Sequence, residues 1–143
     1  MTLNHALAKL EAHWSGEPPV ESILSVEEVE NSLGSPLPAN FKAFLMWSDG
    51  GETLAPYLRM KFYSLSELLR RRADGQPPDT LEFATDDSCG FAFDLRRHRD
   101  TASYPVVTYP LGDTTRESVE LEADDFLSFI VRITRNSALG WPN

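Results

Sequence analysis

Apolar residues recur at three- and four-residue spacing in the first third of the chain, which is the period of a helix with one buried face. The first such stripe consists of Leu3, Ala6, Leu7, Leu10 and Trp14. It predicts a helix over Thr2–Trp14. A second, short helix is predicted over Val26–Leu33, because Ser25 and Glu28 form a capping-box pattern before it and Gly34 follows it as a stop.

Three more helices follow from the same period and from residues typical of helix ends. The third opens at Pro38, which a first helical turn tolerates, and closes at Asp49–Gly51, where glycine adopts left-handed angles cheaply. A fourth is predicted over Ser64–Arg72, behind a second capping-box pattern. The last is predicted over Asp125–Arg135, with Asp124 as its cap and a strongly apolar stripe.

Between the fourth and last helices, and once before the fourth, the apolar pattern changes to strict alternation. This is the period of a strand with one buried face. The predicted strands are Leu58–Phe62, Leu81–Thr85, Phe91–Leu95, Tyr104–Tyr109 and Ser118–Leu121. Helices, then strands, then a helix indicate an α+β fold with a mainly antiparallel sheet of four to six strands. We expect the helices on one side of the sheet, with a closing C-terminal helix.

The length of 143 residues, of which 41% are hydrophobic, predicts one globular domain over the whole chain. Thirteen Lys and Arg against twenty-two Asp and Glu give a formal net charge of −9. This balance argues against nucleic acids and anionic membranes as partners and favours a basic protein. One long base-free stretch lies between Lys9 and Lys42, and a second acidic stretch runs from Asp74 to Asp94. A run of this kind is ordinarily a solvated face.

Little in the chain points to catalysis, a metal or a cofactor. The single cysteine, Cys89, forms no internal disulfide and has no neighbouring base to activate it. His5 and His13 lie too far apart to share a metal without other ligands. An enzyme would need a pocket at His98, which lies among Arg96, Arg97 and Arg99; solvated arginines are the simpler interpretation. We therefore expect no enzyme and no cofactor, and without a secretory signal or an apolar span we expect a cytoplasmic protein.

The third helix and its flanks, LGSPLPANFKAFLMWSDGGE, resemble the signature of the SUKH superfamily, Smi–Knr type. Three further segments match the family pattern in the expected order. They are Gly90–Asp94, which resembles a glycine-led strand ending in aspartate, Tyr104–Val107, which resembles the next strand, and Ala123–Ile130, which resembles the closing helix. The resemblance extends from about Ile23 to Arg135.

The resemblance implies an α+β fold and a protein-binding role without catalytic residues. Bacterial members are mostly immunity proteins that bind and neutralise a cognate toxin domain, frequently a nuclease or deaminase. The alternative is a scaffold or regulatory adaptor, as in the yeast relative that regulates cell-wall assembly. Because a nuclease is usually basic where it holds phosphate, an acidic protein suits the first function. The toxin's identity and the oligomeric state stay open.

We choose the candidate contact residues by their charge and by their position in predicted turns. Asp49 and Glu52 lie in the turn after the third helix, and Asp86 and Asp87 lie in the next acidic turn. Trp14 falls on the apolar stripe of its predicted helix and is assigned to the core. Trp47 lies off the stripe of its helix, so it is either a core-edge residue or an apolar anchor of the binding surface.

Overall fold

The computed structural model describes residues 2–20, 23–53, 59–74, 76–77, 79–97, 103–113 and 118–135. Its sheet has seven strands, each hydrogen-bonded to the next along the chain, and every pair is antiparallel. The strands are β1 Trp14–Gly16, β2 Gly51–Thr53, β3 Lys61–Phe62, β4 Thr80–Thr85, β5 Cys89–Asp94, β6 Val106–Pro110 and β7 Glu120–Ala123. The helices are α1 Leu3–Glu11, α2 Ile23–Leu33, α3 Ala39–Trp47, α4 Leu65–Ala73 and α5 Phe126–Arg135, with a short 3₁₀ turn at Leu95–Arg97. The α+β prediction is confirmed.

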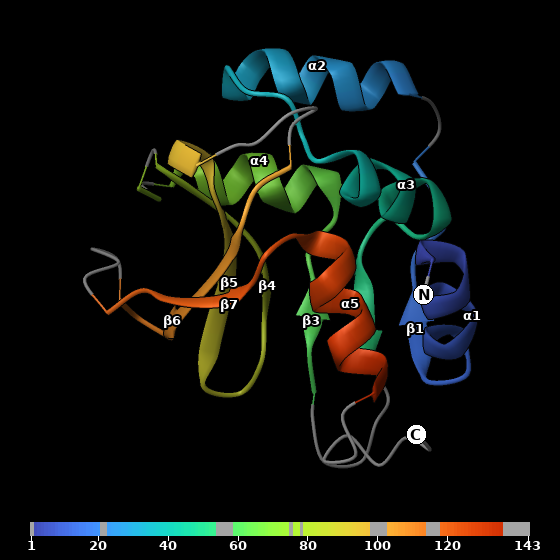
Figure 1. Ribbon diagram of the computed structural model, residues 1–143. Helices are drawn as coiled ribbons and strands as arrows, with labels where there is room; N and C mark the ends of the chain where they lie inside the picture. The colour runs from blue at the N-terminus through green and yellow to red at the C-terminus, as the bar shows by residue number, and fades with distance from the viewer. Residues whose placement is uncertain are drawn as a thin grey trace.

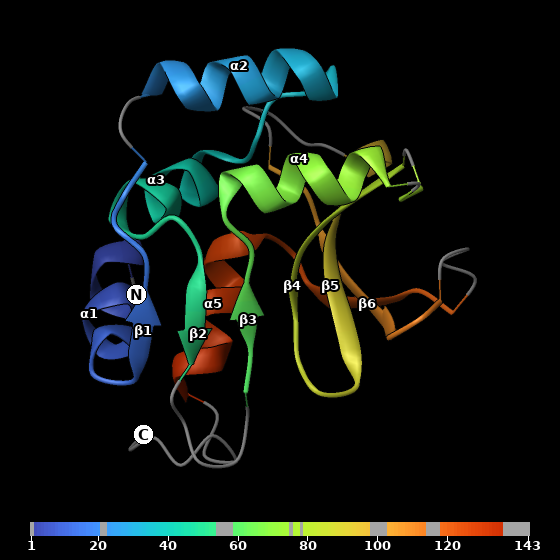
Figure 2. The ribbon, with the colours of Figure 1, turned by 180° about the vertical axis from the view of Figure 1, so that it is seen from behind.

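The helices form two groups around the sheet. Helices α1 and α3 both pack on α5, and these three cover one face, as predicted. Seen from behind, β2 and β3 lie in front of α5 (Figure 2). Helix α4 crosses one end of the sheet, and α2 packs mainly on α4, above it in Figure 1. Helices α2 and α4 therefore form a surface at one end of the sheet, apart from the face that α1, α3 and α5 cover.

Alternation along β4 gives the sheet two different faces. Leu81 and Phe83 enter the main core, where Phe41 and Phe126 meet them from α3 and α5. Glu82 lies between them in sequence and therefore points to the other face. That face holds a smaller cluster, made of Ala92, Val107 and Tyr109. The main core is thus aromatic, and the second face is partly polar.

The prediction of four to six strands was wrong, because β1 and β2 were missed. Both have three residues and contain glycine, so they carry no readable alternation. As a consequence the first helix ends at Glu11, and Trp14 begins β1 instead of closing the helix. Trp14 still packs against the core, through Phe44 and Phe62.

Two predicted helix caps were also wrong, and one was confirmed. Helix α2 begins at Ile23, so Ser25 lies inside it and cannot cap it. At α5 the side chain of Asp125, not Asp124, accepts the Ser128 amide at 2.8 Å. The capping box of α4 is present as predicted, between Ser64 and Glu67. The predicted strand residue Leu58 lies outside the described residues.

Candidate protein-binding surface

The segment Glu17–Val20 is fixed against the end of α3 by backbone hydrogen bonds. The amide of Glu17 donates to the Gly50 carbonyl at 3.2 Å, and the amide of Asp49 donates to the Pro18 carbonyl at 3.2 Å. Two prolines in this segment restrict its backbone further. The result is a rigid corner at which Glu17, Asp49 and β2 lie side by side.

Ser48 ties this corner to the core. Its hydroxyl accepts from Trp14 Nε1 at 3.1 Å and donates to the Gly50 carbonyl at 2.7 Å. The indole lies so close to the neighbouring strand that a Cβ on Gly51 would be 2.5 Å from Trp14 Cζ2. A glycine is therefore required there, which also explains why β2 carries no readable strand pattern.

A hollow of about 270 Å³ opens beside this corner, and we call it the corner hollow. Four carboxylates line it, from the β1–α2 segment, the α3–β2 turn, β2 and α4, together with one base. These residues are Glu17, Asp49, Glu52, Glu67 and Lys61. Lys61 pairs with Glu52 in the strand register and neighbours the core residue Phe62, so both charged side chains project from the outer face of the sheet.

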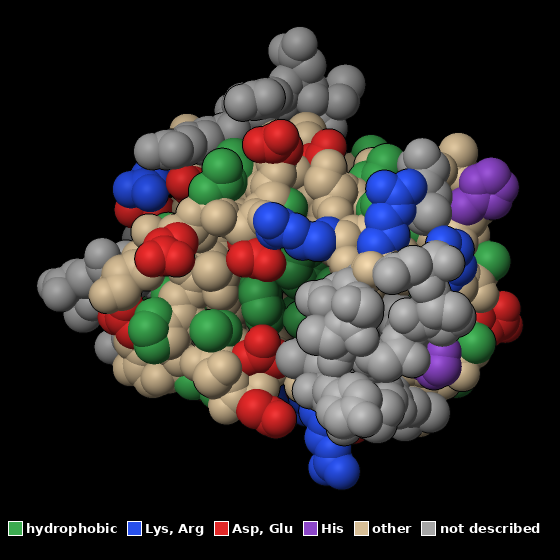
Figure 3. Space-filling model, turned by 60° about the horizontal axis from the view of Figure 1, so that its bottom comes forward, with side chains coloured by type: hydrophobic (Ala, Val, Ile, Leu, Met, Phe, Trp, Pro, Cys, Tyr) green, Lys and Arg blue, Asp and Glu red, His purple; other side chains and the backbone are tan. Residues whose placement is uncertain are grey.

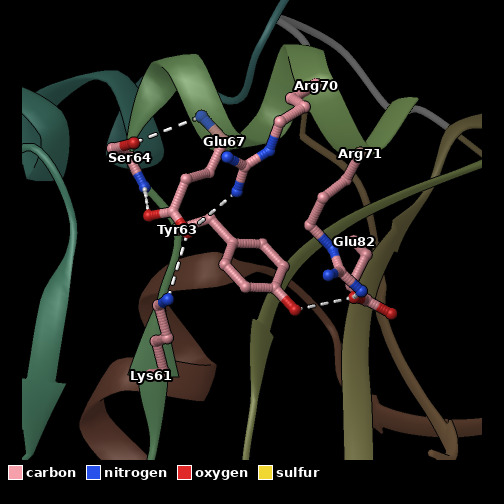
Figure 4. A network of polar contacts seen from close by, with 7 residues as sticks. All are labelled: Lys61, Tyr63, Ser64, Glu67, Arg70, Arg71 and Glu82. Carbon is pink, nitrogen blue, oxygen red and sulfur yellow. Dashed lines mark hydrogen bonds and ion pairs between the residues drawn. The ribbon is translucent and has the colours of Figure 1, made fainter. Parts of the chain in front are cut away.

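Lys61 holds the carboxylate of Glu67, with Nζ 3.1 Å from Oε2. Burial alone would raise the pKa of Glu67, but hydrogen bonds from the Ser64 amide and Lys61 outweigh it, and the pKa is lowered. Arg70 lies 3.9 Å from the same oxygen. Figure 4 shows Lys61 and Arg70 converging on Glu67. Even when Arg70 is counted with Lys61, four carboxylates stand against two bases, so the local charge still favours a cation.

The structure brings two of the five predicted contact residues together. Asp49 and Glu52 both line the corner hollow. Glu52 is exposed, whereas Asp49 is half-buried and accepts the Leu65 amide at 2.8 Å, which caps α4. Asp49 therefore also has a structural role, which its position in a turn did not reveal.

The other predicted residues lie elsewhere. Trp47 is half-buried, with its ring 5.5 Å from that of Trp14 and 5.7 Å from that of Phe44, which places it at the edge of the core. Asp86 accepts the Ser88 and Cys89 amides at 2.8 and 2.6 Å and so shapes the β4–β5 hairpin. Asp87 is exposed in that hairpin, which does not line the corner hollow.

Sequence reasoning missed Glu17 and Glu67 as members of the surface. Glu17 lies in the base-free stretch between Lys9 and Lys42, and this stretch was the available signal. Glu67 was recognised only as a capping-box residue. Its place beside Glu52 depends on the pairing of β2 with β3, and no sequence pattern indicated β2.

A buried carboxylate joins α4 to the second face of the sheet. Glu82 is 5% exposed; its Oε1 accepts from the Tyr63 hydroxyl at 2.8 Å and from Arg71 Nη2 at 2.6 Å. Its Oε2 accepts from the Tyr109 hydroxyl. The guanidinium of Arg71 also lies over the Tyr63 ring, 4.6 Å from its centroid (Figure 4). These contacts hold the helix that forms one wall of the candidate surface.

The buried tyrosines predict a loss of stability at alkaline pH. Burial raises the pKa of Tyr63, and the Glu82 carboxylate raises it further; burial and then Glu30 raise the pKa of Tyr104. Above pH about 10 the unfolded chain loses these protons first, so the free energy of unfolding falls by up to about 1.4 kcal/mol per pH unit for each tyrosine. Denaturant unfolding between neutral pH and pH about 11 should show this slope. Tyr63→Phe should make this slope shallower, because only the contribution of Tyr104 is left. An unchanged slope in that variant would contradict the role given to Tyr63.

No metal or membrane feature emerges in the part of the chain that the structure describes. Among these residues no three His, Cys, Asp or Glu side chains are placed to hold a metal ion. None of the described helices is long and apolar enough to cross a membrane. Arg96 is paired with Asp94 at 3.1 Å, while His98 and Arg99 lie outside the described residues.

The corner hollow differs in charge from the face at the lower end of the molecule. Seen with the lower end of Figure 1 brought forward, acidic and basic side chains are interspersed (Figure 3). The corner hollow instead has four carboxylates and one base. The local charge there, rather than the net charge alone, marks this corner as a candidate contact surface.

Comparison with known proteins agrees with the resemblance noted in the sequence. The family model described as SMI1 / KNR4 family (SUKH-1) matches residues 22–132. A search of curated proteins finds no match to the chain. The matched region runs from just before α2 into α5 and so contains strands β2 to β7. The chain therefore belongs to the SMI1 / KNR4 family (SUKH-1).

Proposed function

We propose that this protein is a non-catalytic immunity protein that binds and neutralises a basic toxin domain, of nuclease or deaminase type. The observation that carries the proposal is the corner hollow, which is lined by four carboxylates from separate segments of the chain and by one lysine. Backbone hydrogen bonds of Glu17 and Asp49, and the bond between Ser48 and Trp14, fix the backbone of this corner. The charges are therefore presented without a large ordering cost on binding.

The charge of the chain supports this function in two ways. A net charge of −9 attracts a basic partner over distance and raises the association rate at low salt. A standard interface covers about 800 Å² on each partner, roughly a tenth of the 7705 Å² surface of this protein. One acidic face is therefore large enough to cover the phosphate-binding surface of a nuclease.

Capture of the partner tests the proposal directly. The purified protein is mixed with the C-terminal domain encoded by the gene beside its own, and affinity is measured at low and high salt. We expect a dissociation constant near ~1 nM that weakens with salt. Absence of binding at low salt would overturn the immunity function and favour the adaptor alternative, for which capture from whole lysate is the next step.

Charge reversal at Glu52 tests the surface. Glu52→Lys should slow association about tenfold at low salt, because it removes one carboxylate from the corner hollow and adds a second base. Glu11→Lys is the matched control: it makes the same charge change at an exposed position on α1. Stopped-flow association rates compare the two. Equal rates would remove the corner hollow from the interface.

A further inference from the structure

A second, larger groove adjoins the corner hollow and extends between α2 and the first turn of α4. Its volume is about 570 Å³. Glu17 and Asp49 line both hollows, so the two adjoin at the corner. We call it the α2–α4 groove; none of the sequence patterns pointed to it, because its walls come from four separate segments of the chain.

The floor of the α2–α4 groove is apolar. Val20, Val29 and Leu65 line it and are between 4% and 8% exposed, so each has a small part of its side chain open to the groove. Leu69 adds a half-buried side chain from the next turn of α4. An apolar floor of this kind gains free energy when a partner's side chain displaces water from it.

The charged residues of the groove all have the same sign. Glu17, Glu28 and Asp49 line it, and no lysine or arginine is among its described lining residues. Asp49 already accepts the Leu65 amide, so the first turn of α4 is capped from within the protein. The groove therefore combines an apolar floor with carboxylates on its walls, which complements a peptide segment that carries both apolar and basic side chains.

The walls of the groove are held firmly enough to select a partner. Pro18 and Pro19 form one wall, and the amide of Val20 is bonded to the Leu45 carbonyl at 3.2 Å. The α4 wall is anchored on the sheet through Arg71 and Glu82. The third wall, α2, packs on α4 above it (Figure 2). A preformed groove lowers the ordering cost of docking.

We propose that the α2–α4 groove is the docking site for a segment of the partner protein in which an apolar side chain is flanked by arginine or lysine. This inference deepens the proposed function and rests on it for the identity of the partner. The apolar side chain enters the floor at Val20, Val29 and Leu65, and the cations lie against Glu28 and Glu17. A second copy of the chain is a poorer occupant, because its net charge is also −9.

Two neighbouring glutamates on α2 provide the test. Glu27 and Glu28 are both exposed, but only Glu28 lines the groove. Glu28→Lys and Glu27→Lys change the net charge equally, so they affect long-range attraction alike and differ only in local contact. The probe is the peptide acetyl-Arg-Leu-Leu-Arg-amide, titrated against the full chain while methyl NMR signals are followed.

We expect saturable shifts of the Val29, Leu65 and Leu69 methyl signals in the wild type and in Glu27→Lys. Glu28→Lys should weaken binding of the peptide about tenfold, a loss that corresponds to 1.4 kcal/mol. Equal affinities in the two variants, or shifts that avoid these three residues, would overturn the groove proposal. Thermal melts that coincide for both variants confirm that folding is intact.

The toxin domain separates this proposal from the function on which it rests. If the wild type binds the neighbouring gene's domain and Glu28→Lys weakens binding about tenfold more than Glu27→Lys, both proposals are supported. If both variants bind that domain equally well, the groove is wrong and the immunity function stands. If the peptide binds in the groove but the toxin domain does not bind, the groove stands and the immunity function fails.

Discussion

Glu82→Ala is expected to lower the free energy of unfolding by about 3 kcal/mol, a large share of the stability of a domain of this size. The carboxylate is 5% exposed and accepts from two tyrosine hydroxyls and from Arg71. Its removal takes this acceptor from two tyrosine hydroxyls that water reaches poorly, and it takes the ion-pair partner from the half-exposed Arg71. Urea unfolding followed by tryptophan fluorescence measures the loss.

Two variants show whether the loss comes from the buried contacts. Glu122→Ala in β7 removes a carboxylate that pairs with Arg132 at 3.3 Å but at the surface, where such pairs contribute at most about 1 kcal/mol. A Glu82→Leu, Arg71→Leu double variant removes both charges together and should be less destabilised than the sum of its single variants. Additive losses would show that Arg71 and Glu82 do not depend on each other.

Helix α4 links this contact to the proposed function. Arg71 lies on the same helix as Leu65 and Leu69, which line the α2–α4 groove. Loss of Glu82 therefore loosens a wall of the groove as well as the core. For this reason binding data on a Glu82 variant do not identify a contact residue, and the exposed pair Glu27 and Glu28 is the better test of the interface.

The sequence predicted the elements that contain enough residues to show a period. Helix α5 and the strands β4, β5 and β6 were found within a few residues of their ends, because buried and exposed positions alternate or recur along them. Helix α4 was found from its capping box. The motifs of the family resemblance lie on α3 with its flanks and on β5, β6 and α5, and the family was correctly identified from them.

The candidate surface was predictable only in part, because short elements and long-range contacts build it. Asp49 and Glu52 were proposed from charge and turn position, and both line the corner hollow. Glu67 joins them only through the pairing of β2 with β3, which no local pattern revealed. The α2–α4 groove requires two helices separated by more than thirty residues to lie together, and periodicity within each helix cannot show that.

Phe83→Ala is expected to be the most destabilising single change, at about 4 kcal/mol. Phe83 is fully buried, and its ring lies within 6.2 Å of five other phenylalanine rings. These rings come from α3, β3, β5 and α5, and they are Phe41, Phe62, Phe93, Phe126 and Phe129. A cavity at this point has rigid neighbours on every side and collapses little.

Phe91→Ala is the matched control for this prediction. It lies on the same face of the sheet in the adjacent strand, is 6% exposed, and has one ring contact among the described residues, with Phe129. Its replacement should cost less than that of Phe83 by about 1–2 kcal/mol, because fewer neighbours lose contacts and water reaches the site more easily. Equal losses in urea unfolding would mean that the core relaxes around either cavity, so that Phe83 does not act as the centre of the aromatic packing that joins α3, α5 and the sheet.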